Sequence, residues 1–323
     1  MAALSTPGHA AGVKINPLLG LLIFMLAIPA PAEIHQWRDA QGRLHFSDKA
    51  PEQADSKTVN IDVRSPNRQD VIVFQRQEFK LSAENEALVR QALPEIVALY
   101  QQQLGLDVRN NVTVNLHLLE SKAAFDLWLK ARIGDARRPS ASGIYITGTR
   151  EVAVWKWSTN EADVVRTILH ESSHVILAQL ASNVPRWLHE GLAEYVEQLQ
   201  LTDKGMRVNL NQQAVSRLRQ WITTEELISL RNYLSLSEQQ WQNLMHESSS
   251  IPYTVAWATV YFMLSRPTGR QTLRQILHRL EKNNERPDAA LLDSLYPGGL
   301  TNMDYDFFRW AQQDSIAAHH YND

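Results

Sequence analysis

The pattern of apolar and polar positions divides the chain into three zones. A continuous apolar run occupies residues 18–28, near the N-terminus. Short segments that alternate apolar and polar residues follow as far as Trp157, and from Asn160 onward apolar residues recur mostly at helical spacing. Alternation is typical of strands, whereas recurrence every three or four residues is typical of amphipathic helices. A small sheet followed by helices is the order of an α+β fold.

The strand and helix signals between residues 66 and 160 are specific enough to give ranges. Ser82 is a good helix N-cap and Gly105 a good helix stop, so they bound one helix. The alternating segments predict a small mixed or antiparallel sheet. The predicted strands are 71–74, 112–119, 143–147 and 152–157, and the predicted helices are 82–104 and 122–130.

The N-terminal apolar run has the layout of a secretory signal peptide. Its 11 residues, 18–28, follow Lys14, and Ala30 and Ala32 supply small residues at a cleavage site. A run this short does not span a bilayer. We therefore expect cleavage of residues 1–32, export to a periplasm and no stable membrane span afterwards; an uncleaved N-terminal membrane anchor is the alternative. The chain has no cysteine, so its stability does not depend on disulfides.

The segment after the expected cleavage site predicts a β-hairpin. Trp37, Leu44 and Phe46 are its apolar strand residues, and Gly42 suits its turn. Residues 49–70 are polar and contain two prolines, which is typical of a linker. The hairpin resembles a small N-terminal domain of unknown function found in many exported bacterial proteins. We expect residues 33–65 to be a structural module with its linker.

The charge of the chain argues against one class of partner. The formal net charge is -3, and no basic block stands out in the sequence. Nucleic-acid-binding proteins carry a clustered basic surface that neutralises phosphates. We therefore expect no nucleic-acid partner, and the sequence leaves the oligomeric state open.

The candidate chemistry lies in a helical run that carries unexpected charge. His170, Glu171 and His174 form the pattern H-E-x-x-H within an apolar stretch. Residues four apart lie on one face of a helix, so the two imidazoles can bind one zinc ion. The intervening glutamate can then accept a proton from water. The pattern predicts one catalytic zinc, with two histidine ligands and Glu171 as general base.

A catalytic zinc needs a third protein ligand. The metzincin pattern would place glycine and histidine at positions 177 and 180, but Leu177 and Leu180 stand there. A glutamate on a following helix is the other route, and the turn at Pro185 lets residues 187–197 fold back as that helix. Glu190 and Glu194 lie one turn apart on it, and either one could be the ligand. His189 is expected to point away from the site.

The motifs together resemble the gluzincin (peptidase-MA-like) zinc metallopeptidases. In that family H-E-x-x-H is followed by W-L-x-E-G-x-A-x-Y, which here begins at Trp187. The resemblance implies that Glu190 is the third ligand and that Glu194 orients a ligand histidine. The short separation of the two motifs is closer to the less characterised bacterial, DUF1570-like members. A third block, at residues 249–264, resembles the segment whose tyrosine stabilises the oxyanion, which implies that role for Tyr253.

One block of the zinc aminopeptidases is missing. They carry a glycine-and-glutamate motif on a strand before the zinc helix, and the corresponding region here has Glu151 without that motif. Nothing therefore argues for an aminopeptidase. An edge strand, expected at residues 152–157, could bind an extended peptide by strand addition.

These expectations define one main hypothesis and two alternatives. The main hypothesis is an exported zinc-dependent peptidase that acts on a peptide or protein, with a zincin-like catalytic domain at residues 66–265 and a C-terminal helical subdomain at 266–323. The first alternative is a non-catalytic zinc-binding envelope protein. The second is a scaffold that holds no metal.

Overall fold

The structure is a computed structural model that describes residues 34–38, 44–47, 57–59, 71–108, 110–134, 141–248, 250–283 and 289–321. The chain divides into two compact units, Met1–Ser65 and Pro66–Asp323. The predicted signal peptide, residues 1–32, lies outside the described residues and stays a prediction. Within the described ranges, no helix combines the length and the apolar character needed to cross a membrane.

The first unit contains a three-stranded antiparallel sheet. Its strands are β1 (Ile34–Arg38), β2 (Leu44–Ser47) and β3 (Lys57–Val59), in the order β2-β1-β3. The β1–β2 pair confirms the predicted hairpin. The range predicted as linker contains β3, which pairs with β1. A three-residue strand is too short to show alternation, so its pairing partner rather than a local pattern makes it a strand.

A four-stranded mixed sheet opens the second unit. Its strands are β4 (Ile72–Gln77), β5 (Val114–Leu119), β6 (Gly143–Ile146) and β7 (Glu151–Trp155), in the order β4-β5-β7-β6. The first two pairings are parallel, and β6 pairs antiparallel with β7. The α+β fold class is confirmed. The edge strand expected at residues 152–157 is wrong: β7 lies between β5 and β6, and the two edges of the sheet are β4 and β6.

Two helical layers cover the two faces of this sheet. Val152 and Val154 pack into the main core, whereas Ala153 between them packs into a second, smaller cluster. This alternation is the period of a strand. Helices α1 (Ala83–Leu104) and α3 (Glu161–Leu180) contribute to the main core, and α2 (Lys122–Ile133) contributes to the smaller cluster. The zinc motif is therefore on the α3 side of the sheet.

The ends of α1 lie where the sequence predicts them. The Ser82 hydroxyl accepts a hydrogen bond from the Asn85 backbone N–H, and Gly105 ends the helix at φ 69°. A side-chain oxygen satisfies a free N–H at a helix start, and a left-handed residue commonly ends a helix.

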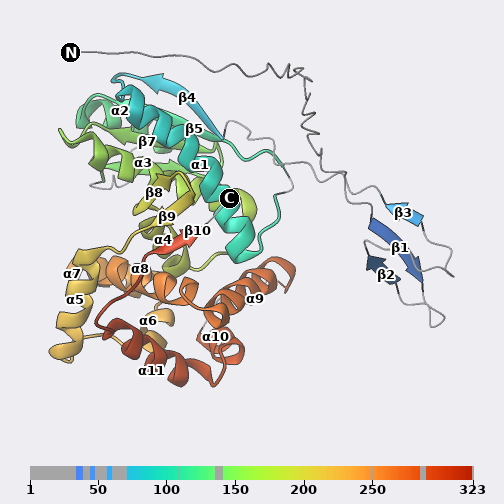
Figure 1. Cartoon of the computed structure of the whole chain (residues 1–323). Helices are drawn as coiled ribbons and strands as arrows, with labels where there is room; N and C mark the ends of the chain where they lie inside the picture. The colour runs from blue at the N-terminus through green and yellow to red at the C-terminus, as the bar shows by residue number, and fades with distance from the viewer. Residues whose placement is uncertain are drawn as a thin grey trace, which may run out of the picture. The chain divides into compact units, whose positions relative to one another are not determined.

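Most of the remaining chain is helical. The helices are α4 (Arg186–Val196), α5 (Gln212–Thr223), α6 (Leu230–Leu234), α7 (Glu238–Glu247), α8 (Ser250–Leu264), α9 (Pro267–Asn283), α10 (Ala289–Leu295) and α11 (Gly299–Ala311). Figure 1 shows α8 to α11 gathered at the end of the unit away from the four-stranded sheet. The sequence did not predict the antiparallel sheet formed by β8 (Leu199–Thr202), β9 (Gly205–Val208) and β10 (His319–Tyr321).

A glycine lets α4 lie close against α8. A Cβ atom added at Gly191 would meet the backbone oxygen of Ala256 at 2.5 Å and Val260 Cγ2 at 2.6 Å. Real Cβ atoms do not approach so closely, so a larger residue would push the two helices apart. Glu190 precedes this glycine and Tyr253 lies on α8, so the same contact positions both candidate site residues.

Gly191→Ala is expected to destabilise the protein. Overpacking costs about 1–3 kcal/mol, against about 1 kcal/mol that alanine gains over glycine in a helix, so a net loss of up to about 2 kcal/mol is expected in the free energy of unfolding. Chemical denaturation measures it. Gly148→Ala is the matched control because a Cβ there meets nothing within 4 Å. A Gly191 variant that is more stable than the wild type would contradict the close packing.

Candidate metal centre

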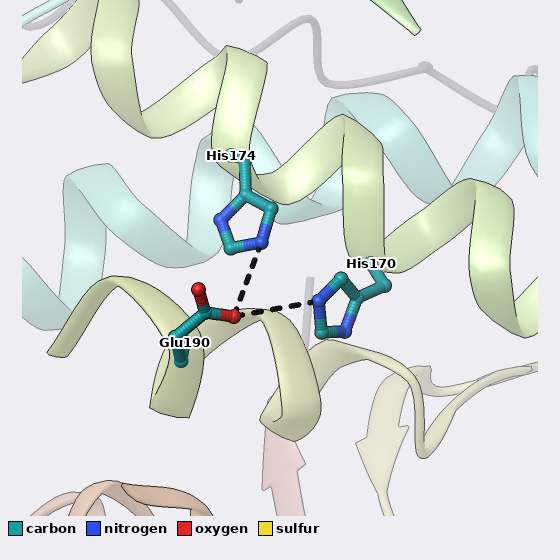
Figure 2. A group of neighbouring side chains, drawn as sticks. All are labelled: His170, His174 and Glu190. Atoms are coloured by element: carbon teal, nitrogen blue, oxygen red, sulfur yellow. Dashed lines mark ion pairs between the residues drawn. The ribbon is translucent and has the colours of Figure 1, made fainter. Parts of the chain in front are cut away.

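Two packed helices bring the candidate ligands together. Helix α3 begins at an Asn160 cap and carries His170 and His174 one turn apart. Helix α4 begins after Pro185, packs against α3 and carries Glu190. Figure 2 shows the Glu190 carboxylate pointing toward both imidazoles of the neighbouring helix. The residues that the two sequence motifs predict as ligands therefore meet at one point.

The three side chains form a compact group in which His174 and Glu190 are buried and His170 is half-buried. Glu190 Oε2 lies 3.7 Å from His170 Nε2 and 3.5 Å from His174 Nε2. His174 is 2% exposed and Glu190 6%. The three ligand atoms all lie within 4.8 Å of one another, which makes this a group that could hold a metal ion.

The distances suit a shared ion better than direct contact. A hydrogen bond between these atoms would be about 2.7–3.2 Å long. Ligand atoms at about 2.0–2.2 Å from a tetrahedral zinc lie about 3.4 Å apart. The observed 3.5 and 3.7 Å match that ligand-to-ligand spacing. Two imidazole nitrogens and one carboxylate oxygen are also a donor set that zinc accepts.

The charges of the group hold His174 and Glu190 in the states suited to ligation, whereas His170 carries a proton that a metal would have to displace. Burial lowers the pKa of His174 to about 4, so its imidazole is neutral at pH 7. Burial alone would raise the pKa of Glu190, but His170 and His174 hold it far below its usual value. Burial also opposes protonation of His170, yet Glu190 and Glu197 hold its pKa well above the ordinary value without a metal. A cation at the centre would replace that proton.

The second oxygen of Glu190 has its own partner. Arg186, one turn earlier on α4, places Nε 3.6 Å from Glu190 Oε1. Arg186 Nη1 also contacts Glu238 Oε1 at 2.5 Å. The guanidinium thus contacts a different oxygen of the carboxylate from the one that the imidazoles face. This arrangement leaves Oε2 as the oxygen that faces the histidines.

The carboxylate that orients His170 is not the predicted one. His170 Nδ1 makes a 2.6 Å hydrogen bond with Glu197 Oε1. The sequence assigned that role to Glu194, which lies nearby in a second group with His170 and Glu197 but makes no hydrogen bond in the described part of the chain. Burial and then the Glu197 charge raise the pKa of Glu194. Glu190, Glu194 and Glu197 are spaced at i, i+4 and i+7, so this acidic stripe was the sequence signal for Glu197.

Glu197→Ala is expected to weaken metal affinity by about 10–100-fold, the usual scale for a partner that orients a ligand. Glu194→Gln should change affinity less, because the raised pKa of Glu194 favours a neutral carboxyl that glutamine imitates. Competition with a metal-binding dye gives both dissociation constants. A larger effect at Glu194 than at Glu197 would return the orienting role to Glu194.

Two aromatic rings from elements other than α3 pack around His174. The Tyr145 ring, from edge strand β6, has its centroid 4.3 Å from the His174 centroid. The His189 imidazole lies at 4.5 Å and nearly parallel to His174, at 11°. The expectation that His189 points away is therefore wrong: the face of α4 toward α3 includes both His189 and Glu190. Burial and then the charges of Glu190 and Glu171 raise the pKa of Tyr145 to about 12.

Glu171 lies beside the ligands, between α3 and β6. A Cβ atom added at Gly143 would lie 2.9 Å from Glu171 Cγ, so the glycine leaves room for this side chain. Burial raises the pKa of Glu171 to about 7. A carboxylate with a pKa near neutrality can both accept and return a proton.

Tyr253 lies in the first turn of α8 and is half-buried. Burial and then the Glu190 charge raise the pKa of Tyr253, so the phenol stays protonated. The site carboxylates are among its neighbours.

Glu151, the glutamate of the region that corresponds to the aminopeptidase motif, is engaged elsewhere. It pairs with Arg132 at 2.8 Å and with His117 at 3.0 Å.

Two family models match parts of the chain. Residues 164–286 match the family described as a protein of unknown function (DUF1570). That range contains His170, His174, Glu190 and Tyr253, and it confirms the DUF1570-like resemblance. Residues 21–70 match a domain of unknown function (DUF4124). No curated protein matches the chain.

Proposed function

We propose that this protein is an exported zinc-dependent peptidase whose ion is held by His170, His174 and Glu190. The observation that carries the proposal is the triad itself, because its atoms are spaced as ligands of one ion. Three protein ligands are typical of a catalytic zinc, since the fourth position then takes water or substrate. One zinc per chain is proposed.

When bound, zinc polarises a carbonyl group and makes a neighbouring water more acidic. The residues of the chain supply the remaining chemistry. Glu171 takes a proton as the water oxygen bonds to the carbonyl carbon, and the π pair moves to the carbonyl oxygen. When the C–N bond breaks, Glu171 returns the proton to the leaving nitrogen. Its position between α3 and β6 and its pKa of about 7 support this double role.

Tyr253 is proposed to donate a hydrogen bond to the oxyanion. Its phenol stays protonated in this buried, acidic surrounding, so it can donate. A donor aimed at developing negative charge stabilises the transition state. The resemblance to the third peptidase block gives the same role to this residue.

Strand β6 is proposed to align the substrate. It forms one edge of the mixed sheet, and its residue Tyr145 contacts His174. An extended peptide that adds to a sheet edge is held by main-chain hydrogen bonds. This geometry favours a peptide or an unfolded protein segment as substrate.

The decisive experiment joins metal analysis to cleavage. Mature protein, expected to begin at Glu33, is purified from the cell envelope and its metal content is measured, with about one zinc expected per chain. The same preparation is incubated with a peptide library, and products are identified by mass spectrometry. Bound zinc without cleavage would favour a non-catalytic zinc-binding envelope protein. Absence of bound metal would favour a scaffold.

A further inference from the structure

The two candidate histidine ligands are held in different ways. His170 has an outer partner, because its Nδ1 atom bonds Glu197 at 2.6 Å. His174 Nδ1 is buried and has no hydrogen-bond partner in the described part of the chain. Ligand histidines normally bond a carboxylate, carbonyl or water through the second nitrogen, which fixes the ring. Among the described residues, the contacts that can orient His174 are therefore those made by its ring.

Two rings from different elements meet the His174 imidazole. The Tyr145 centroid is 4.3 Å away at an interplanar angle of 36°, and the His189 centroid is 4.5 Å away at 11°. The Tyr145 and His189 centroids are only 5.6 Å apart. If His174 lay between the other two rings, their centroids would be much farther apart than this. The three rings therefore form a triangle, in which each ring is near both others. We call Tyr145, His174 and His189 the ring triangle.

This packing restricts the His174 ring. Both flanking centroids lie within 4.5 Å of the His174 centroid. Rotation about the Cβ–Cγ bond of His174 would therefore bring its imidazole into collision with a flanking ring. Aromatic pairs at such distances also attract one another beyond the area they bury. We propose that Tyr145 and His189 are positioning residues that hold the His174 imidazole for metal binding by ring packing, in place of a hydrogen bond.

The inference rests on the proposed metal site and gives strand β6 a second task. Gly143 and Tyr145 lie two residues apart on β6, so their side-chain positions share one face. Gly143 faces Glu171 and Tyr145 faces His174. The strand proposed to align the substrate therefore also sets the space for the general base and the plane of one ligand.

Cobalt(II) titration of the full mature protein tests the inference, with visible absorption reporting both affinity and ligand geometry. Tyr145→Ala and His189→Ala are each expected to weaken cobalt binding by about 10–100-fold, the scale seen when an orienting partner is lost. Their absorption bands should also shift. Tyr145→Phe and His189→Phe keep a ring at each position and should bind cobalt close to the wild-type affinity.

Ile144→Ala is the matched control. Ile144 lies next to Tyr145 on β6 but packs into the smaller cluster on the other face of the sheet. It should keep wild-type cobalt affinity although it loses core contacts. The two ring positions lie on separate elements, so a folding failure of one alanine variant, seen by circular dichroism, leaves the other to decide.

Several results would overturn the ring-packing role. They are wild-type affinity in the alanine variants, phenylalanine variants as weak as the alanine ones, and an equal loss in Ile144→Ala. A wild-type protein that binds no cobalt would overturn the metal site as well. A wild-type protein that binds cobalt and cleaves no peptide, while the variants behave as expected, would overturn only the peptidase function.

Discussion

Glu171→Gln is expected to leave the metal bound while peptide hydrolysis falls by about 10²–10⁴-fold, the usual cost of losing a general base. Glutamine has nearly the same shape, so it should fit the space that Gly143 leaves. Glu171 is not a member of the candidate ligand group, which explains why the ion should stay. Glutamine cannot take up the proton, which explains the loss of rate.

Metal content and the initial cleavage rate are measured on one preparation of each variant. Glu84→Gln, an exposed carboxylate in the first turn of α1, is the control for the substitution itself and should change neither quantity. A Glu171→Gln enzyme that cleaves at the wild-type rate would exclude the mechanism. Loss of the metal in the same variant would make Glu171 a ligand and not a base.

Local features of the sequence predicted most of the helices and the first strands. Ser82 and Gly105 bound α1 as expected, because caps act on the few residues beside them. The hydrophobic alternation also found every strand of the mixed sheet. The order of the strands was harder to predict: an edge strand was expected at residues 152–157, yet β7 pairs with β5 on one side and β6 on the other and therefore lies inside the sheet. The pairing with β5 joins segments separated by a helix and depends on tertiary packing.

The sheet formed by β8, β9 and β10 was even harder to predict from local sequence. Strand β10 pairs with β9, although His319 and its partner Val208 are more than a hundred residues apart in the chain. Both strands are short, so neither carries enough alternation to predict itself. Buried contacts among Tyr195, Tyr261 and His319 hold this sheet to the helices, and they exist only once the fold is complete.

Some residues of the candidate site could be predicted from local sequence, whereas others are brought together only by the fold. The spacing of His170 and His174 follows from one helical turn, so the sequence could predict that pair. The involvement of Glu190 followed from a resemblance, and the fold brings it to the histidines. Tyr145 could not be predicted, because its contact depends on how closely β6 approaches α3. The acidic stripe on α4 pointed to both Glu194 and Glu197, but the choice between them depends on how α4 is rotated.

Glu190→Ala is expected to remove the metal. Loss of a residue that only orients a ligand weakens metal affinity by about 10–100-fold, and loss of Glu190 should weaken it further because Glu190 is a proposed ligand. The substitution takes away the oxygen that faces both imidazoles. Activity should be lost with the metal. Arg186 is not left without a carboxylate, because it also contacts Glu238, so folding should survive well enough for the measurement.

Glu194→Ala is the matched comparison, since it removes the same chemical group one turn later on α4. Zinc content after dialysis, cobalt affinity and melting temperature are measured for both variants. Glu190→Ala should lose the ion at a melting temperature that still shows a folded protein, and Glu194→Ala should retain it. If Glu194→Ala strips the metal while Glu190→Ala keeps it, the third ligand is Glu194. In that case Glu190 and Glu194 would exchange roles, since Glu194 already lies with His170 in the second group that the fold brings together.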